Sequence, residues 1–204
     1  MDKEFLVKKL DNLNFSQKII SAFKKVPREE FVPKEFKHQS YEDIALPIGN
    51  KQTISQPYTI AVMLEELKLE PKQKVLELGS GIGYVLALIS EIVEEEGQVY
   101  GVEIIEEIAE KSKRYLKKYK NIEIYNKNGT KGLPQKASFD RVIMSAACSQ
   151  IPNEIIAQIR EGGLIVAPIG SSFSQNIITL KKENEELIVE QERQGFVFVP
   201  FVEK

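Results

Sequence analysis

The sequence predicts an α/β protein whose doubly wound, mostly parallel sheet has seven strands. Two observations lead to this fold class. From residue 74 onward, short apolar runs alternate with longer segments of helical periodicity, and such alternation covers both faces of a parallel sheet with helices. A glycine-rich turn directly follows the first of these runs. We expect strands at 74–79, 98–103, 121–125, 139–145, 163–168, 175–182 and 186–192, and helices at about 84–94, 104–118 and 151–160.

The N-terminal part predicts two helices and then a long irregular segment. Apolar residues at helical spacing between residues 3 and 25 predict two short helices, with Ser16 as the N-cap of the second. Residues 33–56 show no sustained period, but their apolar and aromatic side chains predict packed order. Pro57 suits the first position of the helix that follows.

Composition narrows the class of protein. At 204 residues, with 42% apolar and 28% charged residues, the chain is long enough for one globular domain with a core. We expect a single domain over 1–204, in which 1–56 form an extension that covers the site and 57–204 form the core. The net charge of −2 and the lack of a basic block give a nucleic-acid partner no electrostatic support.

Cysteine usage and hydropathy predict a cytoplasmic protein that does not enter membranes. A single cysteine, Cys148, excludes an internal disulfide and fits a reducing compartment. The N-terminus lacks a signal-type apolar stretch, and no apolar run approaches the roughly 18 residues of a membrane span. We interpret Cys148 as a buried hydrophobe and His38 as structural. We expect no metal, because no cluster of side chains has metal-ligand spacing.

A glycine turn between two predicted strands indicates a nucleotide site. Gly79, Gly81 and Gly83 follow the first strand, and the second strand ends on Glu103, whose carboxylate can accept hydrogen bonds from both hydroxyls of a ribose. A dinucleotide fingerprint would need a glycine where Tyr84 stands. Glu77, just before the turn, suits a ligand with an ammonium group and suits a diphosphate badly. This arrangement resembles the first motif of S-adenosylmethionine (SAM) methyltransferases of the Rossmann-like class.

A second stretch carries a more specific resemblance. The segment LPIGNKQTISQPY at 46–58 resembles the signature of the protein-L-isoaspartate (D-aspartate) O-methyltransferase family. Further matches run in order over nearly the whole chain: VPRE and FVP within 26–33, YED at 41–43, VLELGSG at 75–81, GLP and FD within 132–140, AA at 146–147, IP at 151–152, GG at 162–163 and FVP at 198–200.

The resemblance implies a Rossmann-like SAM-dependent methyltransferase that repairs aged proteins. Such enzymes methylate the free α-carboxylate of L-isoaspartyl residues in damaged proteins and peptides. The ester then collapses to a succinimide, which can reopen to normal aspartate. The sequence leaves open whether D-aspartyl residues are also accepted. Isoaspartyl proteins and peptides are therefore the expected partners, and SAM is the expected cofactor.

The resemblance also assigns roles to individual residues. It places Ser55 at the reacting centre, where its hydroxyl can position one oxygen of the substrate carboxylate, with Thr53 assisting. A different interpretation makes Ser55 an N-cap ahead of the Pro57 helix. The expected cofactor residues are Glu77, Gly79, Ser80, Gly81, Gly83, Glu103, Asn128 and Gly129, and the expected substrate residues are Asp43, Pro47, Ile48, Gln52, Ile54, Val199 and Pro200.

Three positions depart from the family's pattern. Asn128 stands where the family has an acid that accepts from the adenine amino group, so we expect somewhat weaker adenine binding; Asn128-Gly129 is also a common turn. Lys51 and Lys127 stand where glycine is usual. Lys51 would be strained if its position requires a positive φ.

Other interpretations of the whole chain stay open at this point. It could be a SAM-dependent methyltransferase of another substrate, or a non-catalytic module that keeps the fold. The C-terminal tail could bind substrate, or it could be a final strand that closes the core. We expect a monomer, because the helix predicted at 104–118 is rich in Glu and Lys and indicates a solvated face.

Overall fold

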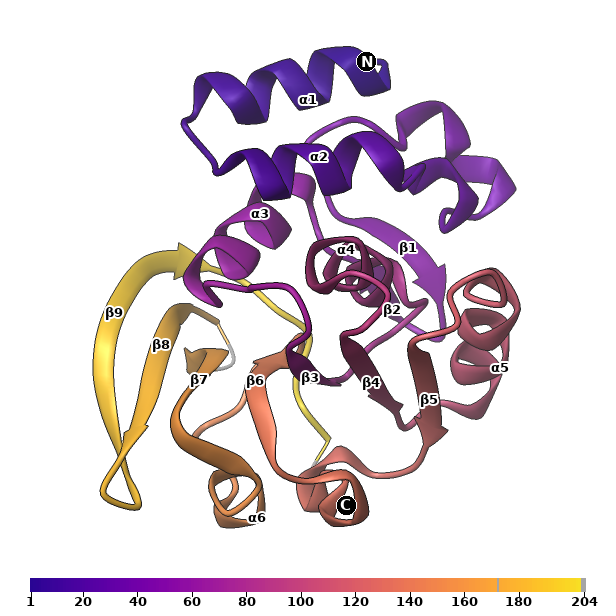
Figure 1. Cartoon of the computed structure of the whole chain (residues 1–204). Helices are drawn as coiled ribbons and strands as arrows, with labels where there is room; N and C mark the ends of the chain where they lie inside the picture. The colour runs from indigo at the N-terminus through magenta and orange to yellow at the C-terminus, as the bar shows by residue number, and fades with distance from the viewer. Residues whose placement is uncertain (172, 203–204) are drawn as a thin grey trace.

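A seven-stranded sheet runs through the centre of the computed structural model, which describes residues 1–171 and 173–202 (Figure 1). The strands are β3 (Lys74–Leu78), β4 (Gln98–Glu103), β5 (Ile122–Asn126), β6 (Phe139–Met144), β7 (Ile159–Gly170), β8 (Gln175–Glu183) and β9 (Glu186–Phe196). Their order across the sheet is β5-β4-β3-β6-β7-β8-β9. β3 to β7 are parallel, and β8 and β9 extend one edge as antiparallel strands.

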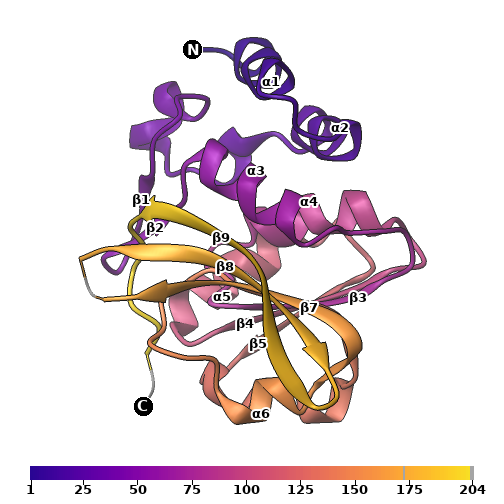
Figure 2. The same cartoon turned by 90° about the vertical axis from the view of Figure 1, so that its left-hand side faces the viewer.

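Helices and short 3-10 turns cover the two faces of this sheet (Figure 2). The α-helices are α1 (Lys3–Asn12), α2 (Gln17–Lys25), α3 (Pro57–Glu66), α4 (Tyr84–Val93), α5 (Glu106–Tyr115) and α6 (Asn153–Ile156), and the 3-10 turns are η1 (Arg28–Glu30), η2 (Lys34–Gln39), η3 (Gly129–Lys131) and η4 (Pro134–Lys136). Among the described residues, no helix has the length and apolar character that a membrane crossing requires.

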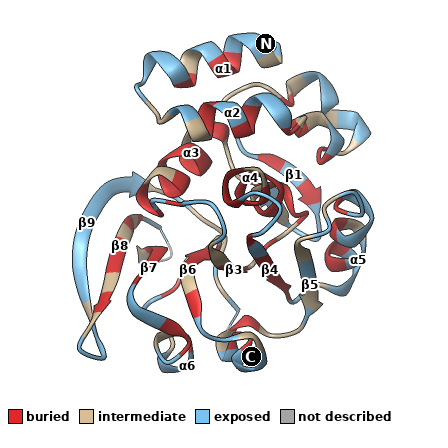
Figure 3. Ribbon diagram, viewed as in Figure 1, coloured by how far each residue is buried: buried red, intermediate tan, exposed pale blue. Residues whose placement is uncertain are grey.

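Two apolar layers form the core, one on each face of the sheet (Figure 3). Successive side chains of a strand point to opposite faces, so Val75 joins the layer under α1 to α5 and Leu76 joins the layer that includes α6. Both side chains are fully buried. The central strands are therefore covered on both faces, as their near-continuous apolar sequence predicts.

The strand order places a crevice at the carboxyl end of β3. From β3 the chain proceeds outward to β4 and β5 on one side, and then returns to place β6 and β7 on the other side. The strand order thus reverses between β3 and β6, so the connections leave these two strands in opposite directions. Ligands of open α/β sheets bind in the crevice at such a reversal.

The predicted order of strands and helices is confirmed, with one helix much shorter than expected. The strands predicted at 175–182 and 186–192 are present and pair as a hairpin, with Glu183 opposite Glu186. The prediction of a helix over 151–160 is wrong beyond Ile156. Ile159 already pairs with Phe139 in β7, so the chain leaves the helix to join the sheet.

The extension contains a small β-hairpin that its sequence did not reveal. β1 (Leu46–Gly49) and β2 (Gln52–Ile54) form a separate two-stranded antiparallel sheet. The side chains of Leu46, Ile48 and Ile54 are buried against the core, which confirms packed order in residues 33–56. Strands of three and four residues are too short to show a period of two.

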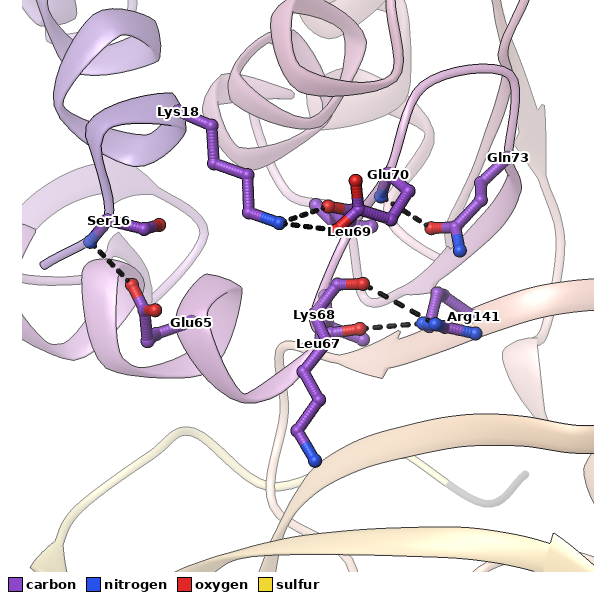
Figure 4. Close-up of polar contacts among 9 residues, drawn as sticks. All are labelled: Ser16, Lys18, Glu65, Leu67, Lys68, Leu69, Glu70, Gln73 and Arg141. Atoms are coloured by element: carbon purple, nitrogen blue, oxygen red, sulfur yellow. Dashed lines mark hydrogen bonds and ion pairs between the residues drawn. The ribbon is translucent and has the colours of Figure 1, made fainter.

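Polar contacts dock the first helices on the rest of the chain (Figure 4). Ser16 has an extended backbone before α2, but its side chain makes no capping bond; its backbone N–H instead donates to Glu65 of α3 at 2.9 Å. Lys18 donates to the Leu69 carbonyl at 2.6 Å and to Glu70 at 2.8 Å. The α1–α2 pair is thereby fixed to the end of α3.

The tip of the β1–β2 hairpin has an unusual backbone. Gly49, Asn50 and Lys51 have φ angles of +101°, +49° and +58°. Glycine and asparagine adopt such angles readily, whereas the Cβ of lysine makes the left-handed region cost roughly 1–2 kcal/mol. The departure at Lys51 is therefore a strained one.

We predict that Lys51→Gly stabilises the protein. The relief of about 1–2 kcal/mol exceeds the extra chain entropy of glycine, about 0.5–1 kcal/mol, so the Tm should rise by roughly 1–4 °C in thermal unfolding. Lys51→Ala is the matched control, because it removes the side chain and keeps the Cβ. An equal rise for alanine would show that the backbone conformation is not the cause.

Candidate active site

A cavity of about 340 Å³ lies at the carboxyl ends of β3, β4 and β6. That volume is within the range of small-molecule sites. The turn after β3, the β1–β2 hairpin and the C-terminal tail form its walls. The lining residues are Ile48, Gln52, Thr53, Ile54, Ser55, Glu77, Gly79, Ser80, Gly81, Ile82, Tyr84, Val85, Val102, Glu103, Ile104, Ile105, Gly129, Ser145, Ala146, Val199, Pro200, Phe201 and Val202.

The glycine turn presents its backbone to this cavity. Gly81 has a φ of +51°, and a Cβ added there would lie 3.6 Å from the side chain of Ile48, in the space between the turn and the hairpin. Gly83 has a different role, because it does not line the cavity. It precedes α4 with a φ of +88°, and a Cβ there would lie 2.4 Å from Ser112 of α5. Gly83 thus permits close packing of two helices.

Glu103 holds the turn and also faces the cavity. Its Oε2 accepts from the Gly81 N–H at 2.8 Å, and its Oε1 accepts from the Ile105 N–H at 2.9 Å. Burial raises the pKa of this carboxyl, while the backbone hydrogen bonds oppose the rise. Each oxygen can accept a further hydrogen bond, so these backbone contacts leave room for the two ribose hydroxyls, and that role of Glu103 stays a prediction.

Glu77 is a buried carboxyl with an unused oxygen. The side chain is 1% exposed, and its Oε1 accepts from the Ser145 hydroxyl at 2.6 Å. Oε2 is buried without a hydrogen-bond partner among the described residues. Burial raises the pKa of Glu77 to about 8, and the nearby Glu103 adds to the rise. A ligand ammonium group would supply both the missing donor and the missing positive charge, which fits the methionine end of SAM.

The hairpin and the C-terminal tail meet above the turn. Ala147, after β6, donates its N–H to the Val199 carbonyl at 2.8 Å, and its own carbonyl accepts from the Phe201 N–H at 2.7 Å. These bonds hold Val199 and Pro200 against the cavity, and their contact with substrate stays a prediction. The tail is therefore both packed and part of the site wall.

A second, smaller cavity of about 60 Å³ adjoins the first. Thr53, Ser55, Ser145 and Val199 line both cavities. No residue lining the smaller cavity carries a charged side chain; the others are Ala45, Gln56, Thr59, Val197 and Phe198. Ser55 therefore lies at the boundary between a cavity with two carboxyls and one with none. The interpretation of Ser55 as an N-cap is wrong, because Gln56 holds that position before α3.

Besides Gly83, three more predicted site residues lie outside the lining of the larger cavity. Asp43 pairs with Lys9 at 2.9 Å and accepts from the Tyr58 N–H at 2.8 Å. Pro47 is exposed on the hairpin. Asn128 Oδ1 accepts from the N–H and the hydroxyl of Thr130, both at 2.8 Å. These contacts give Asp43 and Asn128 a structural role, and the ligand contacts of all three residues stay predictions.

Sequence reasoning missed several wall residues. Tyr84, Ser145 and Phe201 line the larger cavity, and Phe201 packs so closely on Gly129 that a Cβ there would lie 2.9 Å from its ring. Ser145 directly follows β6, at the carboxyl edge of the sheet and next to the end of β3. Its position after a predicted strand could therefore have identified it as a site residue. The position of Phe201 depends on tertiary folding of the tail.

Comparison with known proteins identifies the family. The family model described as protein-L-isoaspartate(D-aspartate) O-methyltransferase matches residues 1–204. The chain belongs to this family. The predicted family, the α/β methyltransferase fold and the class of SAM-dependent enzyme are confirmed with it.

Individual relatives agree over nearly the whole chain. A protein-L-isoaspartate O-methyltransferase of Methanosarcina mazei is 38% identical over 99% of this chain and 84% of its own. The one of Methanothrix thermoacetophila is 40% identical over 100% of this chain and 96% of its own. A solved structure titled protein-L-isoaspartate O-methyltransferase has a TM-score of 0.90 at 29% identity, and covers 98% of this chain and 65% of that one.

S-adenosylhomocysteine carries the same ammonium group as SAM. We predict that the affinity of the protein for it decreases as the pH is lowered from 8. The ammonium requires ionised Glu77, whose pKa is raised to about 8 without ligand, so binding at lower pH must first remove a proton. Calorimetry should show a loss of roughly tenfold per pH unit below that value, with proton release on binding.

Glu77→Gln is the control for this pH dependence. It should bind S-adenosylhomocysteine weakly, with an affinity that is nearly constant from pH 6 to 8. Persistence of the full dependence in this variant would assign it to another group, such as Glu103, and contradict the prediction.

Proposed function

We propose that this chain transfers a methyl group from SAM to the free α-carboxylate of L-isoaspartyl residues in damaged proteins and peptides, which initiates their repair. The observation that carries the proposal is the place of Ser55, at the boundary between the cavity that contains Glu77 and Glu103 and the uncharged cavity beside it. Membership of the family supports the choice of acceptor.

The proposed acceptor needs no general base. A carboxyl group has a pKa near 4 and is already a nucleophilic anion at neutral pH. SAM, when bound, supplies a methyl group that its sulfonium has already activated. The remaining task of the protein is orientation, which can contribute on the order of 7–11 kcal/mol. In this scheme the Ser55 hydroxyl donates a hydrogen bond to one carboxylate oxygen, and Thr53 assists.

The distribution of charge suits these partners. The carboxyls of Glu77 and Glu103 lie on the side proposed for SAM, the cationic methyl donor. The smaller cavity presents hydroxyl groups to the anionic acceptor and contains no negative charge that would repel it. Val199, which is partly buried, adds an apolar side chain to the wall beside the acceptor. An extended peptide could reach this cavity beside the tail, pairing with its backbone by strand addition.

The proposal also covers the cellular compartment, the oligomeric state and the partners of the enzyme. We place it in the cytoplasm as a monomer that acts on proteins and peptides. The single cysteine supports a reducing compartment. The net charge of −2 argues against a nucleic-acid partner.

We predict methyl transfer to an isoaspartyl peptide and none to its aspartyl twin. The two peptides differ only in which carboxyl of the residue is free, so the comparison isolates the acceptor. Radiolabelled SAM provides the measurement, and the labelled product should be base-labile, as an ester is. Equal labelling of both peptides, or of neither, would overturn the proposed function.

We also predict that Ser55→Ala lowers kcat on the isoaspartyl peptide by about 10–100-fold, because one positioning donor is lost. The affinity for S-adenosylhomocysteine should change less than about twofold, since the cofactor residues are untouched. Ser21→Ala, on the exposed side of α2, is the control. Unchanged kcat in Ser55→Ala would remove this hydroxyl from the mechanism.

A further inference from the structure

Arg28 is a buried cation that contacts both sides of the proposed active site. It belongs to η1 in the extension and is 0% exposed. Its Nη1 donates to the Ser55 carbonyl at 2.8 Å, and its Nη2 donates to the Ile44 carbonyl at 3.3 Å. Its guanidinium carbon lies 5.3 Å from the centre of the Tyr84 ring. Burial lowers its pKa to about 10, so it remains charged at neutral pH.

Space filling alone does not account for this residue. No described carboxylate forms an ion pair with Arg28, and its Nε is buried without a partner among the described residues. A buried charge with no carboxylate in contact is costly even though Asp43 lies near enough to attract it, and an aliphatic side chain of similar size would fill the space at lower cost. The planar guanidinium can, however, bind two carbonyls at fixed angles, which neither lysine nor an aliphatic side chain can do.

The two carbonyls flank the open end of the β1–β2 hairpin. Ile44 precedes β1 and Ser55 follows β2, while Leu46 and Ile54 form the first pair between the strands. Arg28 therefore joins the two chains where they enter and leave the hairpin. A two-stranded hairpin is marginally stable by itself, so the position of this one depends on its contacts with the rest of the chain, which are its buried apolar side chains and the Arg28 hydrogen bonds.

The opposite end of the hairpin gives little support. Its tip is the strained turn at Gly49, Asn50 and Lys51. The side-chain contact there is an exposed one, in which Asn50 donates to Glu107 of α5 at 3.1 Å. The Arg28 hydrogen bonds at the open end, which we call the Arg28 clamp, are therefore better shielded from solvent than the Asn50–Glu107 hydrogen bond at the tip.

We propose that Arg28 is a positioning residue, which holds the Ser55 backbone against the cofactor side of the site so that acceptor and methyl donor meet in line. Tyr84, on which the guanidinium rests, is the first residue of α4 and lines the larger cavity. One side chain thereby fixes the hairpin relative to the helix that follows the glycine turn. Displacements near 1 Å are sufficient to impair a reaction that depends on alignment. The inference rests on the proposed function.

Arg141 offers a matched control within the same chain. Its Nε donates to the Leu67 carbonyl at 2.6 Å and its Nη2 to the Lys68 carbonyl at 3.4 Å, after the end of α3 (Figure 4). Burial also lowers its pKa. Arg141 lines neither of the two cavities. It therefore performs the same kind of clamping away from the chemistry.

The experiment compares Arg28→Lys and Arg28→Met with Arg141→Lys in the full chain. We expect each Arg28 variant to lower kcat on the isoaspartyl peptide at least tenfold, with KM for the peptide and the Kd of S-adenosylhomocysteine changed less than about threefold. Arg141→Lys should lower the Tm by an amount similar to that of Arg28→Lys. It should keep kcat within about twofold of the wild-type value. In the Ser55→Ala background, Arg28→Lys should have little further effect on kcat, because Arg28 acts through the position of the Ser55 hydroxyl, which alanine has already removed.

Amide hydrogen exchange tests the clamp independently of catalysis. Exchange in residues 46–54 should rise in Arg28→Lys and stay unchanged in Arg141→Lys. If the wild-type protein does not methylate the isoaspartyl peptide, the proposed function is refuted. The exchange result would still show whether Arg28 holds the β1–β2 hairpin in place. Equal kcat losses in the Arg28 and Arg141 variants, additive effects of Arg28→Lys and Ser55→Ala, or unchanged exchange in the hairpin would overturn the inference.

Discussion

The site depends on how β4 holds the turn that follows β3. The Val102 carbonyl accepts from the N–H groups of Gly79 and Ser80 at 2.9 and 3.0 Å, and the Glu103 carboxylate accepts from the Gly81 N–H at 2.8 Å. These bonds fix the backbone that faces the cavity before any ligand arrives. A ligand that binds a preformed surface spends less of its binding energy on ordering the chain, so the parallel pairing of β3 and β4 is the basis of the site.

Charge is separated across the larger cavity and its neighbour. Burial raises the pKa of Glu77, and the nearby Glu103 adds to the rise, so the ionised pair is unfavourable until a cation compensates it. The adjoining smaller cavity has only uncharged walls. A methyl transfer from a cation to an anion needs this asymmetry, because a carboxylate beside the acceptor would repel it.

The extension supplies the other half of the active site. It contributes the hairpin with Thr53 and Ser55, and it contributes Arg28, which binds the base of that hairpin. Contacts of α2 with α3 and α4, and of α1 with α2, hold the extension on the rest of the chain. The helices at the N-terminus thus affect the chemistry through packing, although they do not line the cavities.

The sequence alone determined the α/β alternation, the glycine turn and the acids around it. Such features are local, since a period, a turn or a motif is complete within a few tens of residues. The family resemblance also located Ser55 and the Val199-Pro200 tail. Only the tertiary structure decided the β1–β2 hairpin, the end of α6 at Ile156 and the burial of Arg28. The hairpin strands are too short to show a period, while the end of α6 and the burial of Arg28 depend on contacts between segments that are distant in sequence. No local pattern encodes which carbonyl a buried guanidinium will bind.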